Sequence, residues 1–414
     1  MKVQRIESII VKKEKELISM LEQSTAIYNQ ALFHMRQEYF KTRDEGKIKT
    51  FSYNQLYKIM KEVEIFKNSN LDFVVKQAVI KQVISNWTSF IRAIISFNKN
   101  PNLFKARPKL PKYLKNGKLN LITIDSTRLR KKNCKENEIR LPKTEYKFKT
   151  RIKRENINCI RVLNFYDKIK IEIIYKRQLV HYDINKGNCV GIDIGLNNLA
   201  TVTSNNQSLS WIINGRPVKS MNQYFNKEKA KLQGKLLKEQ KTSKRIEKLC
   251  KKRKLKLEHY LHWASKEIVY TCLGNNIGTI IIGKNRNWKQ EINLGKRNNQ
   301  NFVQIPFARF IEMIKYKAEE VGIQVFCHEE AYTSKVDHLA LESLGKQENY
   351  LGKRIKRGLF KSSTGKILNA DCNGAIGIMR KQKVITDDQL MILRDRGDIV
   401  SPLIINHYDY KLKR

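Results

Sequence analysis

The sequence has no closely spaced pair of cysteines. Its seven cysteines are scattered singly along 414 residues. A structural zinc site takes most of its ligands from close pairs, so we expect no structural zinc. Isolated thiols of this kind are typical of small buried side chains in a protein that no disulfide framework stabilises.

Long apolar runs are also missing. No run is long enough to span a bilayer, and the N-terminal residues lack the apolar core of a secretion signal. We therefore expect a soluble cytoplasmic protein, associated with the nucleoid through its partners, and no interaction with a membrane.

Acidic residues are few beside the basic ones. The chain has 82 Lys and Arg against 39 Asp and Glu, a formal net charge of +43. Repulsion on this scale is hard to tolerate unless a polyanion neutralises it, so nucleic acid is favoured over a merely solvated basic surface. The excess runs along the whole chain, which suits an RNA–DNA heteroduplex or a structured RNA better than a short operator. A hydrophobic share of 41% is enough for folded cores.

Hydrophobic spacing divides the first half of the chain into strands and helices. Residues 3–11 alternate like a strand, and residues 14–98 repeat apolar side chains at helical spacing. Prolines 101, 108 and 111 then break the chain, and several short alternating segments follow. This order predicts a small barrel-like β domain that contains the first strand and carries the helices as an insertion.

The second half has the order of a mixed α/β layer. Residues 189–204 read as a buried strand, a tight turn at Gly195–Asn198 and a second strand. A third strand, a long basic helical pair within 220–271, and then strand, helix, strand and helix follow. This order is consistent with an RNase H-like layer, although periodicity alone does not prove that fold.

Three acidic positions stand out by their apolar surroundings. Asp193 ends a buried strand, where an unpaired carboxylate would carry a steep desolvation cost. Glu329 and Glu330 end another strand, and only one of two adjacent side chains can face a shared site. Asp371 lies in the first turn of a helix, with Asn369 as the expected N-cap. Divalent metals that cleave phosphodiesters take oxygen ligands of this kind.

Each acid also has a purely structural explanation. Asp193 could cap the end of its strand, the glutamates could be a solvated strand end, and Asp371 could be a partner of the helix dipole. The three together, within one α/β unit, favour a metal site over these separate explanations.

Several segments resemble TnpB proteins, compact transposon-encoded relatives of the type V CRISPR effectors. The sequence GIDIGLNNLATVTSNN, at 191–206, is similar to the first RuvC motif of that family. The resemblance continues through 285–335, LGKRIKRGLF at 351–360 and ILNADCNGAIGIMRK at 367–381. YNQALFHMRQEYF and PKLPKYLKNGKLNL resemble the N-terminal part of the family, so the likeness covers nearly the whole chain.

The resemblance implies an α+β multidomain fold and an RNA-guided activity. By it, the chain would bind a guide RNA (an omega RNA), recognise a short motif beside its target and cleave double-stranded DNA, with Mg or Mn as cofactor and no need for a protein oligomer. Asp193 matches the first catalytic acid and Asp371 the last. The expected parts are a wedge-like β-barrel at 1–13 and 100–185, a helical recognition domain at 14–99, an RNase H-like (RuvC) nuclease domain at 186–331 and 368–382, a basic DNA-loading loop at 332–367, and a C-terminal tail at 383–414.

Two positions depart from the usual family pattern. Most members carry the second acid on the strand that here reads IGTIIIG, followed by a polar stretch, where this chain has Gly283-Lys284 and no carboxylate. A subset, with the eukaryotic relatives called Fanzor, moves that Glu to the strand before the Y-T-S-K motif; here this is Glu330, with Glu329 as the fallback. Many relatives also have zinc-finger cysteines after that motif, whereas this chain has a basic segment.

The resemblance and the charge pattern suggest further nucleic-acid contacts. A solvated basic or polar surface remains the alternative for each of them. The candidates are Gln77 and Gln82 on the N-terminal helices, Lys227 on the basic helical pair, Lys335 of the Y-T-S-K motif, and Lys353, Arg354, Lys356 and Arg357 of the basic segment.

Three functions therefore remain open. The first is a guided nuclease in which Asp193, Glu330 and Asp371 bind the metal ions. Loss of the usual second acid leaves a nuclease-dead guided repressor as the alternative. A transposase or junction resolvase would use the same carboxylates without an RNA.

Overall fold

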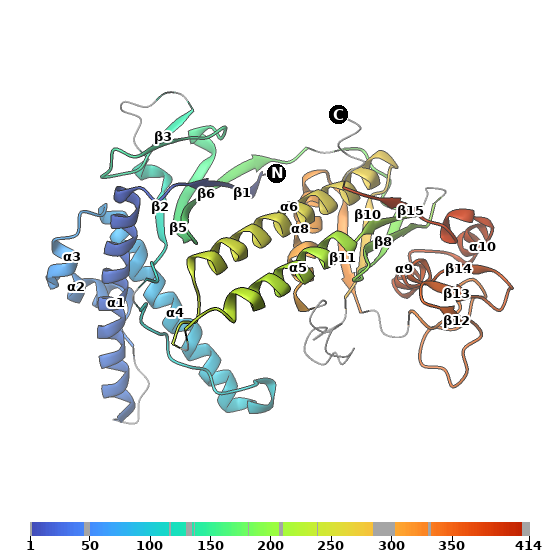
Figure 1. Ribbon diagram of the computed structural model, residues 1–414, viewed down its shortest axis with the longest axis horizontal. Coiled ribbons are helices and arrows are strands. Elements are labelled where there is room, and N and C mark those ends of the chain that lie inside the picture. The colour runs from blue at the N-terminus through green and yellow to red at the C-terminus, as the bar shows by residue number, and fades with distance from the viewer. Residues whose placement is uncertain are drawn as a thin grey trace. The chain divides into compact units, whose positions relative to one another are not determined.

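The computed structural model divides the chain into two compact units, Met1–Gln178 and Leu179–Arg414 (Figure 1). It describes residues 2–44, 50–115, 117–129, 135, 137–180, 182–206, 210–237, 239–284, 303–329 and 333–407. The first unit ends at residue 178, whereas the β domain is expected to end at 185. Within the described ranges, no helix combines the length and the apolar character needed to cross a membrane.

The first unit is built on an antiparallel sheet of four strands. In spatial order these are β1 (Lys2–Val11), β6 (Lys168–Gln178), β5 (Ile157–Phe165) and β2 (Ile122–Asp125). The first strand in the sequence pairs with the last over its full length, from Lys2 opposite Gln178 to Val11 opposite Ile169. β3 (Glu138–Arg140) and β4 (Lys147–Lys149) form a separate hairpin. Among the described residues the four strands pair as an open sheet, not as the closed ring of a barrel.

The helices of the first unit lie between β1 and β2 in the sequence, as the insertion predicts. They are α1 (Lys15–Asp44), α2 (Tyr53–Glu62), α3 (Glu64–Lys67) and α4 (Phe73–Lys99). Trp87 of α4 is fully buried against Tyr39 and Phe90, so it belongs to the core. Asp72 caps α4 and forms an ion pair with Arg128 at 2.6 Å. Burial alone would raise the pKa of Asp72, but the hydrogen bonds from Arg128 and the Val74 N–H, together with the positive charge of Arg128, outweigh burial and hold that pKa below its usual value.

A mixed sheet of six strands forms the centre of the second unit. In spatial order these are β11 (Gln324–His328), β10 (Thr279–Gly283), β7 (Cys189–Asp193), β8 (Asn198–Ser204), β9 (Trp211–Asn214) and β15 (Leu403–Ile405). The chain runs antiparallel through β7, β8 and β9, whereas β10 and β11 are parallel to β7. Three antiparallel strands followed by two parallel ones is the arrangement expected of an RNase H-like layer, and the predicted α+β class is confirmed.

Helices cover both faces of this sheet. α5 (Arg216–Gln233), α6 (Lys244–Gly274) and α8 (Phe307–Glu320) share one core with side chains such as Ile192 and Ile282. On the other face, α9 (Ala370–Lys381) packs against Cys189 and Ile281. Because strand side chains alternate between faces, odd-numbered residues of β7 and β10 face α9 and even-numbered ones face α6 and α8.

The basic segment after the Y-T-S-K motif is a small sheet, not the loop that the sequence suggests. β12 (Lys353–Lys356), β13 (Leu359–Lys361) and β14 (Ile367–Asn369) are antiparallel. Gly358 makes the turn between the first two strands at φ +85°, a backbone conformation that glycine adopts without strain.

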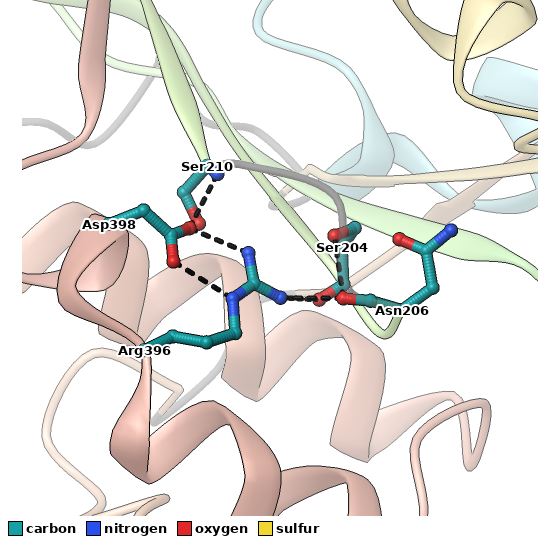
Figure 2. A network of polar contacts seen from close by, with 5 residues as sticks. All are labelled: Ser204, Asn206, Ser210, Arg396 and Asp398. Carbon is teal, nitrogen blue, oxygen red and sulfur yellow. Dashed lines mark hydrogen bonds and ion pairs between the residues drawn. The ribbon is translucent and has the colours of Figure 1, made fainter.

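The segment expected to be a C-terminal tail also contributes to the domain. It contains α10 (Asp387–Asp395) and β15, which pairs in parallel with β9. Figure 2 shows how Arg396 anchors it: its guanidinium donates to the backbone oxygens of Ser204 and Asn206 and forms an ion pair with Asp398 at 2.6 Å. The Asp398 carboxylate in turn accepts a hydrogen bond from the Ser210 N–H. Sequence periodicity did not reveal β15, because this strand is only three residues long.

The Arg396–Asp398 pair makes the stability of the second unit depend on pH. Burial alone would raise the pKa of Asp398, but hydrogen bonds from Arg396 and Ser210 hold it below its ordinary value. A carboxyl with a lowered pKa in the folded protein stabilises it above the unfolded-state pKa, about 4, and this stabilisation is lost as the pH falls through the folded value.

Asp398→Asn is therefore expected to lower the melting temperature at pH 7 and to flatten its decline between pH 5 and about 3. Thermal unfolding monitored by circular dichroism across this range measures both effects. Asp388→Asn, at an exposed position of α10, is the control. Equal acid sensitivity of the Asp398→Asn variant and the unmodified chain would contradict the assignment.

Candidate functional site

Asp193 lies at the end of β7, where the buried strand reaches the edge of the core. It pairs with Thr201 of β8 and is half-buried. By alternation its side chain is on the α9 face of the sheet, the same face as Gly191. A Cβ at Gly191 would lie 2.1 Å from the backbone oxygen of Ala375, so only glycine allows α9 this close to β7.

Asp371 lies in the first turn of α9, and its surroundings orient the carboxylate. The Asn369 side chain accepts hydrogen bonds from the N–H groups of Asp371 and Cys372, which confirms the predicted N-cap. Asn198, the first residue of β8, donates from Nδ2 to Oδ2 of Asp371 at 2.6 Å. Arg354 of β12 has its Nη2 4.0 Å from the other oxygen, Oδ1. Both oxygens of this carboxylate thus have a nearby donor.

Asp193 of β7 contacts α9 close to the first turn, which contains Asp371. Gly374 is one helical turn after Asp371, and a Cβ there would lie 2.7 Å from Oδ2 of Asp193 and 3.3 Å from its Cγ. The Asp193 carboxyl therefore packs directly on the α9 backbone beside Asp371. Burial raises the pKa of the Cys372 thiol to about 12, and the neighbouring charges of Asp371, Asp398 and Asp193 add to this rise.

The position of a third acid follows in part from the strand register. His328 pairs with Gly283, and β10 lies between β11 and β7. His328 is therefore on the same face as Asp193, and the exposed Glu329 follows directly after the end of β11. Glu330 lies outside the described residues. Among the residues that are described, no three His, Cys, Asp or Glu side chains group closely enough to bind one metal ion.

The described part of the site fits a hard divalent cation. Its donors are carboxylate oxygens, the ligands that Mg²⁺ prefers. Thr201, the register partner of Asp193, has a buried hydroxyl with no hydrogen-bond partner among the described groups. A buried polar atom of this kind is normally satisfied by water or by a ligand, so the space beside Asp193 has an unused polar group.

The candidate basic residues of the insertion lie on one exposed strand and its turn. Lys353, Arg354 and Lys356 are exposed on β12, and Arg357 is exposed in the turn to β13. Of these, Arg354 is the one whose side chain reaches Asp371. Lys335 is also exposed, with its ammonium 5.9 Å from the centre of the Tyr350 ring.

A buried carboxylate, Asp337, holds this insertion together. Its Oδ2 accepts hydrogen bonds from the Ser363 N–H at 2.6 Å and from the hydroxyls of Ser362 and Ser363, both at 3.0 Å. Glu342 accepts from the N–H groups of Asp337 and Leu351 at 2.6 and 2.8 Å. The network thus joins the segment after the Y-T-S-K motif to the turn between β13 and β14.

The same network is attached to α9, the helix of Asp371. Arg380 of α9 donates to the backbone oxygen of Glu342 and to Nδ1 of His338. Burial lowers the pKa of His338 to about 4, so the ring is neutral and its Nε2 carries the proton, donating to the Thr333 oxygen at 2.7 Å. The position of the β12–β13 hairpin is therefore coupled to that of α9.

Three further candidate residues lie on helices of the two units. In the first unit, Gln77 and Gln82 are half-buried on α4. The Gln82 amide exchanges two hydrogen bonds with the buried Asn120, each 3.1 Å long, so it already has a structural role. In the second unit, Lys227 is exposed on α5.

Sequence reasoning did not find Asn198 or Asp337. Asn198 is in the tight turn that the sequence predicts, but nothing in its spacing indicates a contact 173 positions away in the chain. Asp337 follows an exposed-looking motif in a polar stretch, where burial cannot be read from periodicity. One signal could have indicated Asp337: acidic residues are scarce in this chain, so an Asp within a basic segment is a candidate for a structural or functional role.

Comparison with known proteins gives two family matches. Residues 160–289 match the family OrfB_IS605, described as a probable transposase, and residues 307–378 match the Cas12f1-like TNB domain. The TnpB-like protein ORF457 of Acidianus two-tailed virus is 25% identical, over 89% of this chain and 84% of that protein. The resemblance to TnpB proteins is confirmed.

One solved structure supports the fold of this TnpB-like chain. It is a cryo-EM structure of a Cas12f1–sgRNA–target DNA complex, 16% identical, covering 88% of this chain and 83% of that one, with a TM-score of 0.55. The OrfB_IS605 match spans β7, β8, β9 and β10 with Asp193, and the TNB match spans the hairpin and Asp371. The family supports a RuvC-like nuclease.

Gly374→Ala tests whether the two aspartates share one site. The added methyl should push the Asp193 carboxyl away from Asp371, and Mn²⁺ binding followed by isothermal titration is expected to weaken by tenfold or more, about 1.4 kcal/mol or more. Gly274→Ala, at the end of α6 where nothing lies within 4 Å of the new Cβ, is the matched control. Unchanged Mn²⁺ affinity in Gly374→Ala, with both variants folded, would argue against a shared site.

Proposed function

We propose that the chain is an RNA-guided endonuclease that cuts double-stranded DNA complementary to its guide, beside a short flanking motif. The observation that carries this is that the Asp193 carboxyl packs against Gly374 of α9, one helical turn after Asp371. The excess of 43 positive charges supports a long nucleic-acid partner. The TnpB-like relative and the RNA- and DNA-bound Cas12f1 structure are consistent with that partner being RNA and target DNA together.

Asp193 and Asp371 would hold divalent ions, Mg²⁺ or Mn²⁺, with a third acid nearby. Bound there, such ions activate the attacking water and stabilise the departing oxygen. We propose Glu330 as the third acid, because continued strand alternation after His328 would put Glu330, and not Glu329, on the Asp193 face.

The other residues of the site position the acids and the substrate. Asn198 fixes one oxygen of Asp371 by a 2.6 Å hydrogen bond and so orients the carboxylate that would bind the ion. Arg354, more than half exposed at 58%, is near enough to Asp371 to meet a phosphate that enters the site. Sequence recognition would come from base pairing with the guide, and the protein would read only the flanking motif.

The first test is cleavage by the full chain purified with its co-expressed RNA. In Mg²⁺ it is expected to linearise a plasmid with a matched target, and Asp193→Ala should abolish this, because one of the proposed ligands is lost. Asp387→Ala, at an exposed position of α10, is the control.

Each other outcome of this cleavage test indicates a different site or a different function for the chain. Cleavage by Asp193→Ala at the rate of the unmodified chain would overturn the site. Guided binding without any cleavage would identify the nuclease-dead repressor, and cleavage without bound RNA a transposase or resolvase.

The third acid is tested by a pair of adjacent substitutions. Glu330→Gln is expected to lower the cleavage rate by more than the roughly 10–100-fold typical of an outer-shell residue, whereas Glu329→Gln should leave it close to unchanged. Single-turnover cleavage assays with both variants measure this directly. The reverse ranking of the two would show that Glu329 is the ligand.

A further inference from the structure

A groove runs between α5 and α6, the two long helices that lie side by side in the second unit (Figure 1). Its volume is about 390 Å³, within the range of small-ligand sites. Met221 and the buried Phe225 of α5 and Leu249 of α6 give it an apolar floor.

The floor of this groove, the α5–α6 groove, is held rigid by Arg253. Its guanidinium lies 4.7 Å from the centre of the Phe225 ring, donates to Oδ1 of Asn222 at 2.8 Å and donates to the backbone oxygen of Gln304 at 3.1 Å. Arg253 is thus engaged within the protein, and the groove does not need a ligand to keep its shape.

The rim of the groove is aromatic and cationic. The side chain of Tyr224 is 60% exposed, although large aromatic residues are usually buried. Lys252 and Lys256 are exposed one helical turn apart on α6, and no acidic residue lines the described groove. Its ligand should therefore combine negative charge with a flat apolar face.

We infer that the α5–α6 groove binds an unpaired nucleotide of RNA. The base would stack on Tyr224 above the apolar floor, and Lys252 and Lys256 would contact the phosphates on either side. An aromatic ring beside cations is how proteins bind unpaired bases, because every base has a flat face and every linkage a charge. The choice of RNA rests on the proposed function, in which a guide RNA is the lasting partner.

The position of the groove favours RNA over the DNA strand that is cut. α5, α6 and α8 pack on the face of the sheet with Ile192 and Ile282, whereas α9 and the Asp193 carboxyl are on the other face. A strand held for cleavage has to reach the α9 face. A nucleotide held on the opposite face is away from the candidate cleavage site. This suits a guide RNA, which stays bound while one DNA target is exchanged for another.

The test uses the full chain and an oligouridine of about 15 nucleotides. Tyr224→Ala is expected to weaken binding about tenfold, in the range found for loss of one base–aromatic stack, and Tyr224→Phe to leave it unchanged because the ring remains. Replacing Lys252 and Lys256 by Gln should lower the slope of log affinity against log salt by about 1.4, as expected for two phosphate contacts on a single strand. Photocrosslinking of 4-thiouridine RNA followed by mass spectrometry should label the Tyr224 peptide.

Matched controls and competing probes decide the outcome. Tyr270→Ala and Lys266→Gln, exposed on α6 outside the groove, should bind like the unmodified chain. If Tyr224→Ala lost affinity equally for paired RNA, the groove would be a general phosphate contact, and if it lost affinity only for oligothymidine, the groove would be assigned to DNA. Either result overturns the inference. Normal binding of oligouridine by Tyr224→Ala overturns it as well. Because these assays need no cleavage, the groove can be confirmed even where guided cutting fails.

Discussion

The close contact between α9 and β7 is the constraint on which the second unit depends. Gly191 lets the helix backbone touch the strand, and Gly374 lets the Asp193 carboxyl lie on the helix. Both contacts are too tight for a Cβ, so two glycines on different elements fix how closely α9 approaches the strand that carries Asp193. A site at this contact would be defined by backbone packing and not by a flexible side chain.

Hydrogen bonding to scarce carboxylates organises the rest of this unit. Asp337 joins the two ends of the basic insertion, and Asp398 with Arg396 fastens the C-terminal strand beside β9. Both acids are largely buried and fully engaged, which costs desolvation but defines one geometry when every partner is present. The insertion that carries Arg354 is thereby attached to α9, the helix of Asp371, through Arg380.

Much of this could be predicted from residue patterns, and the failures have a common cause. Long periodic segments gave the strands around Asp193, the basic helical pair and the N-cap at Asn369, because local chemistry determines them. The strands β12 to β15, three or four residues long, are too short for a periodicity, and their pairing is not determined by local sequence. The hydrogen-bond partners of Asn198 and Gln82 are also distant in sequence, so they could not be predicted from local patterns. Asn198 donates to Asp371 on another element, and Gln82 pairs with Asn120, which gives Gln82 a structural role.

The sheet of the second unit also separates acidic side chains on one face from basic side chains on the other. On the α9 face, carboxylates gather against a chain of large positive charge, a costly arrangement unless cations neutralise them. On the other face, the lysines of α6 repel one another until a polyanion approaches. The candidate acids and the lysines of α6 therefore belong to opposite faces of the same sheet. Under the proposed function, this arrangement would let nucleic acid be held on one side of the sheet while the candidate metal site lies on the other.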